Sequence, residues 1–175
     1  MKNRIILFLL TLFAFAACQQ TPAPDPAAEA AKKAVETAAR NIETLKKMYV
    51  ALNAHNVDEF VKYVPDDQID HAAPPDMQKG KENLRKVLSM LFTAFPDLKY
   101  EVENFATNGD IAMAQGNLSG THKGDFMGIP PTNKPFSVKD VDIVRFNEQG
   151  LSAEHWAVQD MRAIFNQLGV APPAN

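Results

Sequence analysis

The chain has 175 residues, of which 46% are hydrophobic and 22% charged, and its formal net charge at pH 7 is −3. This is the composition of an ordinary globular protein with enough apolar residues for one core. The slightly acidic balance and the lack of a basic block in the sequence argue against a nucleic-acid partner and against a charged membrane-binding patch.

The N-terminal segment predicts export. Residues 1–18 begin with two basic residues, continue with an apolar run over 5–15 and end on Cys18, the only cysteine. The run is shorter than a membrane-spanning helix and is typical of a secretory signal. The segment resembles a bacterial lipoprotein signal, which implies that Cys18 is lipidated and anchors the protein to the cell envelope, on the periplasmic side of the outer membrane. Plain secretion after cleavage near Ala17 is the alternative.

Residues 19–26 alternate proline with small polar residues, which predicts an extended tether ahead of a domain over 27–175. Asp25 and Pro26 are typical of a helix start, and the apolar spacing predicts a long helix through Ala54. Its Ala-, Lys- and Glu-rich first part, up to about Arg40, either belongs to the fold or forms a solvated spacer.

The remaining elements follow from changes in apolar period. A short helix opens at Asn56 and stops before Pro65, and a short strand covers 68–71. A helix is expected over 81–95, strands over 98–103, 111–121, 136–148 and 151–160, and a last helix between Asp160 and Gly169. This order predicts an α+β domain with helices packed on one face of a strongly curved antiparallel sheet.

A proline-rich loop over 120–135 separates two of these strands. It contains Gly-x-His-x-Gly around His122, followed by Gly-Ile-Pro-Pro-Thr over 128–132. Here the chain resembles the SnoaL-like polyketide (ester) cyclases of the NTF2-like superfamily, from about Leu45 to Gly169. The resemblance implies an NTF2-like cone, with helices on the concave face of the sheet, and a homodimer. It does not determine a reaction, because one fold hosts many functions.

Charge pairing predicts the register of the last two strands. If residues 149–150 form a two-residue turn, Arg145 lies opposite Glu154, whereas a slip of one residue gathers carboxylates on one face. This register places on one face Asp140, Asp142, His155 and Ala157.

The resemblance also points to a site, with one difference. The acid-base pair of the cyclases, a His on the penultimate strand and an Asp on the last, aligns with Asp142 and Ala157, so the second carboxylate is missing. Asp142 and His155 are the predicted catalytic pair, because a carboxylate beside an imidazole orients it and tunes its pKa. The alternative is that the two side chains only satisfy each other in a half-buried cavity.

The other candidates are weaker, and as substrate-binding residues we expect Asp70, His71, His122, Asp140 and Ala157. His122 or His71 is expected to donate to an enolate oxygen. Alternatively, His122 holds the proline-rich loop through a backbone hydrogen bond and His71 is exposed. The histidines lack metal-ligand spacing, so we expect no metal and no cofactor.

Three functions remain open from the sequence. The first is an exported, lipid-tethered domain with a small-molecule pocket and cyclase- or isomerase-type acid-base chemistry on a carbonyl compound. The second is a module that binds a small ligand without turnover, and the third is a dimeric interaction protein. In each case the expected contacts are a small molecule or a second copy, no nucleic acid, and a membrane only through the lipid.

Overall fold

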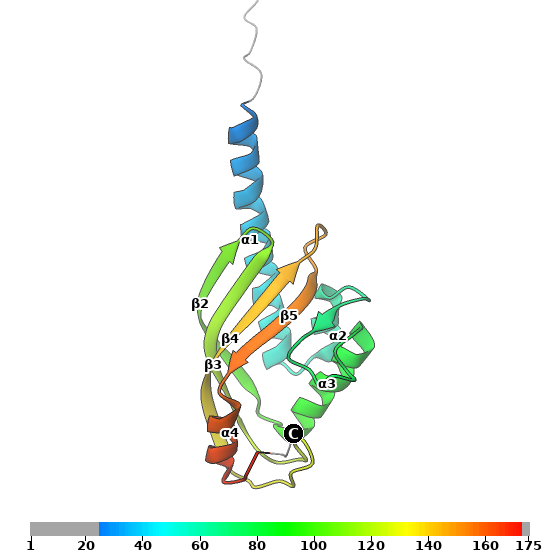
Figure 1. The fold of residues 1–175 in the computed structure, drawn as a ribbon, viewed down its shortest axis with the longest axis vertical. Coiled ribbons are helices and arrows are strands. Elements are labelled where there is room, and N and C mark those ends of the chain that lie inside the picture. Colours follow the sequence, from blue (N-terminus) through cyan, green and yellow to red (C-terminus); the bar gives the residue numbers. More distant parts are fainter. Residues whose placement is uncertain (1–24, 173–175) are drawn as a thin grey trace, which may run out of the picture.

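The computed structural model describes residues 25–172, so the predicted signal, Cys18 and most of the predicted tether lie outside the described residues. The elements follow one another in the predicted order (Figure 1). They are α1 (Pro26–Asn53), α2 (Val57–Phe60), the 3₁₀ helix η1 (Val61–Tyr63), β1 (Ile69–Asp70), α3 (Lys81–Ala94), β2 (Lys99–Asn108), β3 (Ile111–Thr121), β4 (Pro135–Phe146), β5 (Ser152–Gln159) and α4 (Met161–Leu168).

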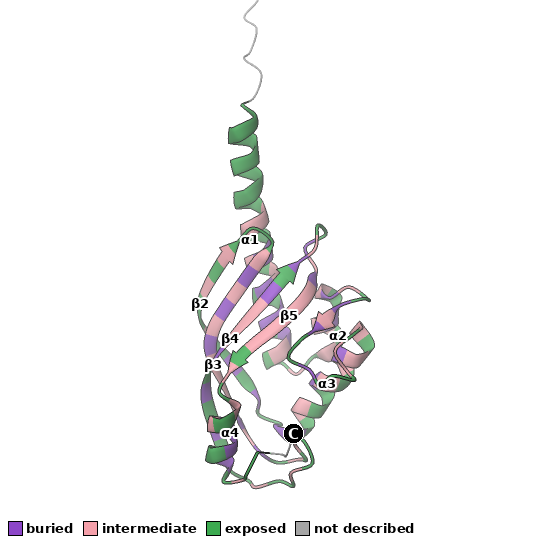
Figure 2. Cartoon of the chain, in the orientation of Figure 1, coloured by how far each residue is buried: buried purple, intermediate pink, exposed green. Residues whose placement is uncertain are grey.

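Helix α1 begins where the sequence predicts it. The carboxylate of Asp25 accepts a hydrogen bond of 3.0 Å from the backbone N–H of Ala27, and Pro26 occupies the first turn. Residues 26–36 are exposed and project beyond the domain, and the first buried residue is Asn41 (Figure 2). The first part of α1 is therefore solvated, and only its second half contributes to the core.

The sheet has the strand order β1-β5-β4-β3-β2, and β2 to β5 form an antiparallel meander. Strand β1 pairs parallel to β5, with Ile69 beside Glu154. The expectation of a purely antiparallel sheet is wrong at this strand. A long connection through α3 and three strands separates β1 from β5, so no hairpin forces them to run in opposite directions.

The predicted register of β4 and β5 is confirmed, with Arg145 opposite Glu154 and Ile143 opposite Trp156. The predicted two-residue turn is wrong. The N–H of Asn147 donates to the carbonyl of Leu151 at 2.9 Å, so the turn covers residues 148–150. The register shift next to Arg145 restores the predicted pairing further along the strands.

The helices cover one face of the curved sheet, which confirms the predicted α+β class (Figure 1). Two apolar clusters hold the layers together. One joins α1, α3 and the sheet and includes Leu45, Met48, Leu88, Tyr100 and Val144; the other lies under α4 and includes Phe95, Leu98, Phe136, Ile164 and Leu168. Within residues 25–172, no helix has the length and apolar character to span a bilayer.

Candidate functional site

Four polar side chains form a continuous hydrogen-bonded chain on the helix-covered face of the sheet. The hydroxyl of Tyr49 donates to Oδ2 of Asp142 at 2.6 Å. The other oxygen of Asp142 lies 3.1 Å from Nε2 of His155. Nδ1 of the same imidazole lies 2.8 Å from Oδ1 of Asp70. We call Tyr49, Asp142, His155 and Asp70 the carboxylate-imidazole cluster.

Strand pairing explains why these residues meet. Asp142 lies opposite Ala157, and His155 lies opposite Val144, so Asp142 and His155 are diagonal neighbours on one face. The sequence predicted contact through a long side chain or one water, and the structure has a direct hydrogen bond. On the other side, β1 pairs Asp70 with His155, and this parallel pairing brings the second carboxylate to the ring.

The cluster keeps His155 charged at neutral pH. Burial alone lowers the pKa of an imidazole, but the hydrogen bonds and charges of Asp142 and Asp70 outweigh it and raise the pKa of His155 to about 10. Burial also opposes ionisation of Asp70, yet the pairing with His155 leaves the pKa of Asp70 below its usual value. The result is an imidazolium between two carboxylates.

Tyr49 is held as a neutral phenol. Burial and the neighbouring charge of Asp142 raise the pKa of Tyr49 far above its usual range. Its ring stacks on that of Tyr100, with centroids 4.6 Å apart. Tyr49 therefore acts in the cluster as a fixed hydrogen-bond donor.

Asp140 lies next to the cluster but does not join its hydrogen bonds. Asp140 precedes Asp142 by two residues on β4, so the two side chains point to the same face of the sheet. The side chain of Asp140 is buried, with only 3% of the residue exposed. Burial and the charge of Asp142 raise the pKa of Asp140 to about 7. Two of the expected substrate-binding residues, Asp140 and Ala157, thus share a face with the predicted catalytic pair, and Asp70 contacts that pair directly.

The other two expected ligand-binding histidines lie elsewhere. Nε2 of His71 is 3.1 Å from a carboxylate oxygen of Glu154, and its ring stacks on Trp156 with centroids 4.6 Å apart. Both partners lie on the face of β5 opposite His155. The structure therefore does not bring His71 to the cluster.

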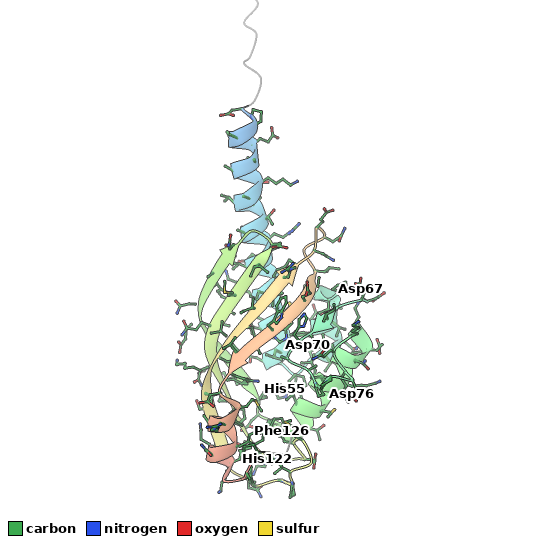
Figure 3. The ribbon with its side chains drawn as sticks, in the orientation of Figure 1. His55, Asp67, Asp70, Asp76, His122 and Phe126 are labelled. Carbon is green, nitrogen blue, oxygen red and sulfur yellow. The ribbon has the colours of Figure 1, made fainter. Side chains whose placement is uncertain are left out.

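His122 is fully buried in the proline-rich loop. Its Nδ1 accepts a hydrogen bond of 3.3 Å from the backbone N–H of Thr132, and its ring packs near Phe95 and Phe126. Figure 3 shows His122 and Phe126 together near α4, at the end of the domain away from Asp70. This arrangement matches the alternative in which His122 holds the loop.

The structure has an open groove of about 360 Å³ between α1 and β2. Its lining is mostly apolar and includes Tyr49, Tyr100 and Phe105. Neither this groove nor the wider hollow of about 560 Å³ beside Arg85 is lined by Asp142 or His155. Tyr49 connects the groove with the cluster, because it is one of the residues that line the groove and its hydroxyl contacts Asp142. The small-molecule pocket expected from the sequence around Asp142 and His155 stays a prediction.

Tyr49 is the member of the cluster that sequence reasoning missed. Tyr49 falls within the apolar spacing of the first helix, which is typical of a core residue, and it does lie in the core. A buried tyrosine normally places its hydroxyl on a polar partner, so a tyrosine in such a stripe is a usable signal for a nearby acceptor.

The curved sheet and the helices on one of its faces define an NTF2-like domain. The chain belongs to the SnoaL-like polyketide cyclase family, whose model matches residues 43–168.

Named relatives and a solved structure agree with this assignment. The chain is 24% identical over 132 residues to the aklanonic acid methyl ester cyclase DauD of Streptomyces sp. strain C5, covering 73% of this chain and 81% of DauD. It is 25% identical over 133 residues to the enzyme of the same description, DnrD, of Streptomyces peucetius, covering 73% and 90%. The solved structure of TsrD from Streptomyces laurentii is similar with a TM-score of 0.69 at 25% identity, covering 76% of this chain and 97% of TsrD.

Proposed function

We propose that this protein is an exported, lipid-tethered enzyme that removes a proton next to a carbonyl group, as a cyclase or isomerase does. The observation that carries the proposal is the carboxylate-imidazole cluster, in which three ionisable side chains from three strands meet on the helix-covered face. Paired titratable groups with shifted pKa values are typical of acid-base sites. The two cyclases among the relatives support the same class of reaction.

Asp142 is the base in this proposal. Its carboxylate has about four lone-pair sites, and Tyr49 and His155 use two of them, so the others are free to accept a proton. Its side chain is 15% exposed. In the reaction, the C–H bond next to the carbonyl breaks, the proton goes to Asp142 and the electron pair moves to the carbonyl oxygen. The resulting enolate is the nucleophile for ring closure or the species that is reprotonated elsewhere.

His155 has a different role from the one the sequence suggested. With a pKa of about 10, it already carries its proton at pH 7 and is no general base. It positions Asp142 and supplies the positive charge that keeps a carboxylate stable in a half-buried place. Asp70 in turn fixes the orientation of the ring.

Binding without turnover is the second candidate function. It is favoured by the engagement of both nitrogens of His155 and both oxygens of Asp142 within the protein. On this view the cluster stabilises the domain, and a ligand occupies the apolar groove beside Tyr49.

The anchor and the pairing of the protein are separate parts of the proposal. The solvated first part of α1 supports a spacer between the domain and a lipid on Cys18. Replacement of Cys18 by Ser should move the protein from the detergent-extracted membrane fraction to the soluble one. On the opposite face of the sheet, Val158 is 61% exposed beside the partly buried Trp156, which supports a homodimer through this face.

The activity is tested by a screen of small carbonyl compounds in D₂O. Proton NMR measures the exchange of hydrogens next to the carbonyl with wild-type protein, Asp142→Asn and the exposed control Asp76→Asn. The proposal predicts exchange that Asp142→Asn abolishes and Asp76→Asn leaves unchanged. Ligand binding without exchange for any compound favours the binding module.

A further inference from the structure

One buried carboxyl beside the cluster has an oxygen without a partner. Within residues 25–172, Oδ1 of Asp140 is fully shielded from solvent and makes no hydrogen bond. Buried polar atoms are nearly always paired, because an unpaired one destabilises the fold. Oδ1 of Asp140 thus costs stability without making a hydrogen bond that explains its burial.

The position of Asp140 is fixed by its backbone. It pairs with Gln159 across β5 and with Gly116 across β3, in the middle of the sheet. The hydroxyl of Tyr100 lies 3.1 Å from the backbone oxygen of Asp140. Because Asp142 pairs with Ala157, Asp140 is the diagonal neighbour of that alanine and lies on the same face as the base.

The surrounding charges favour the neutral form of Asp140. The cluster already holds two carboxylates, Asp70 and Asp142, against the single cation of His155. The two tyrosines that face this part of the sheet, Tyr49 and Tyr100, are neutral because burial raises the pKa of each. The charge of His155 favours ionisation of Asp140, but burial and the charge of Asp142 outweigh it and raise the pKa of Asp140 to about 7. Asp140 therefore holds its proton up to about neutral pH and presents an O–H donor.

We infer that Asp140 is the acid that donates to the carbonyl oxygen of the substrate while Asp142 removes the neighbouring proton. The inference rests on the proposed function and names its missing donor. As the C–H electron pair moves to the carbonyl oxygen, the O–H of Asp140 stabilises the developing charge or transfers its proton to it. The two histidines expected to do this are bound elsewhere, His71 to Glu154 and His122 to the loop. A carboxylic acid kept neutral by burial serves well as such a donor.

The experiment compares Asp140→Leu, which has a similar shape but no donor, with Asp140→Asn, which keeps an N–H donor. The probe is 4-nitrophenol, whose oxygen resembles that of an enolate, and its binding is followed by absorbance. We expect Asp140→Leu to weaken binding about tenfold or more, the usual loss when a hydrogen bond to a charged group is removed. Asp140→Asn should retain most of the affinity. Asp67→Leu, at an exposed aspartate, is the matched control and should leave binding unchanged.

A second measurement follows the side-chain carboxyl carbon of Asp140 by ¹³C NMR, assigned with Asp140→Asn. The inference requires the acid form to persist well above pH 5. The inference is overturned if Asp140 is already ionised at pH 5. It is also overturned if Asp140→Leu still binds nitrophenol as tightly as the wild type. Failure of the proposed function gives a different result, because wild-type protein then neither binds nitrophenol nor exchanges carbonyl hydrogens, whatever the state of Asp140.

Discussion

Tyr49 and Asp142 are joined by a hydrogen bond of 2.6 Å although they lie 93 positions apart in the chain. The bond ties the buried half of α1 to the middle of β4. It also holds one oxygen of Asp142 while His155 holds the other. The carboxylate that we propose as the base is therefore fixed from two directions.

Tyr49→Phe should destabilise the protein by about 1–3 kcal/mol, because it leaves an oxygen of Asp142 without its donor. Urea unfolding measures the change. Tyr63→Phe is the control, since that hydroxyl donates to the partly exposed carboxylate of Glu59; its effect on the unfolding free energy should be much smaller. Equal losses in the two variants would show that the contact with Asp142 contributes nothing to stability.

His155→Gln should lower the free energy of unfolding by about 3 kcal/mol, because it leaves two carboxylates without their cation. This value is at the lower end of the stability losses found when one partner of a buried ion pair is removed, because a quarter of the His155 side chain is exposed. In the double variant with Asp142→Asn, the loss should be smaller than the sum of the single losses. Additive losses would mean that the two side chains do not interact in solution.

Stability should depend on pH through His155. Its pKa is raised to about 10 in the folded protein, against about 6.5 in an unfolded chain. The stabilisation is therefore complete below about pH 6.5 and is lost as the pH rises through about 10. Unfolding free energies measured between these values should fall with pH in the wild type and change less in His155→Gln. Parallel curves for the two proteins would contradict the charged imidazolium.

Asp140 should also make stability depend on pH, in a lower pH range than His155. Its folded pKa of about 7 exceeds the value of about 3.9 for a free aspartate, so the folded form holds a proton that the unfolded chain releases. Stability relative to Asp140→Asn should decline as the pH rises from about 4 to about 7. A constant difference across this range would show that Asp140 ionises normally.

Much of the fold could be predicted from the sequence, because apolar period and turn residues act locally. The charge pair of Arg145 and Glu154 was enough to fix the register that brings Asp142 and His155 to one face. The parallel pairing of β1 could not be predicted, since two residues carry no directional signal. For the same reason the sequence did not indicate that Asp70 contacts the imidazole.

The parts of the site that depend on the packing of helices against the sheet were harder to predict from the sequence. Tyr49 has the spacing of a core residue, and only the angle between α1 and the sheet brings its hydroxyl to Asp142. His122 and His71 have the residue type of a donor, but their backbone positions place them in the loop and on the opposite face. Residue type indicated candidates, and three-dimensional placement selected among them.

In the proposed reaction Asp142 removes a proton next to a carbonyl, and His155 acts through Asp142. The most direct measurement is hydrogen exchange in D₂O on a carbonyl compound turned over by the wild type, repeated with Asp142→Asn, His155→Gln and the double variant. We expect each single variant to lower the exchange rate by at least about a hundredfold and the double variant to be no slower than Asp142→Asn. Exchange at the wild-type rate in Asp142→Asn would contradict the proposed reaction.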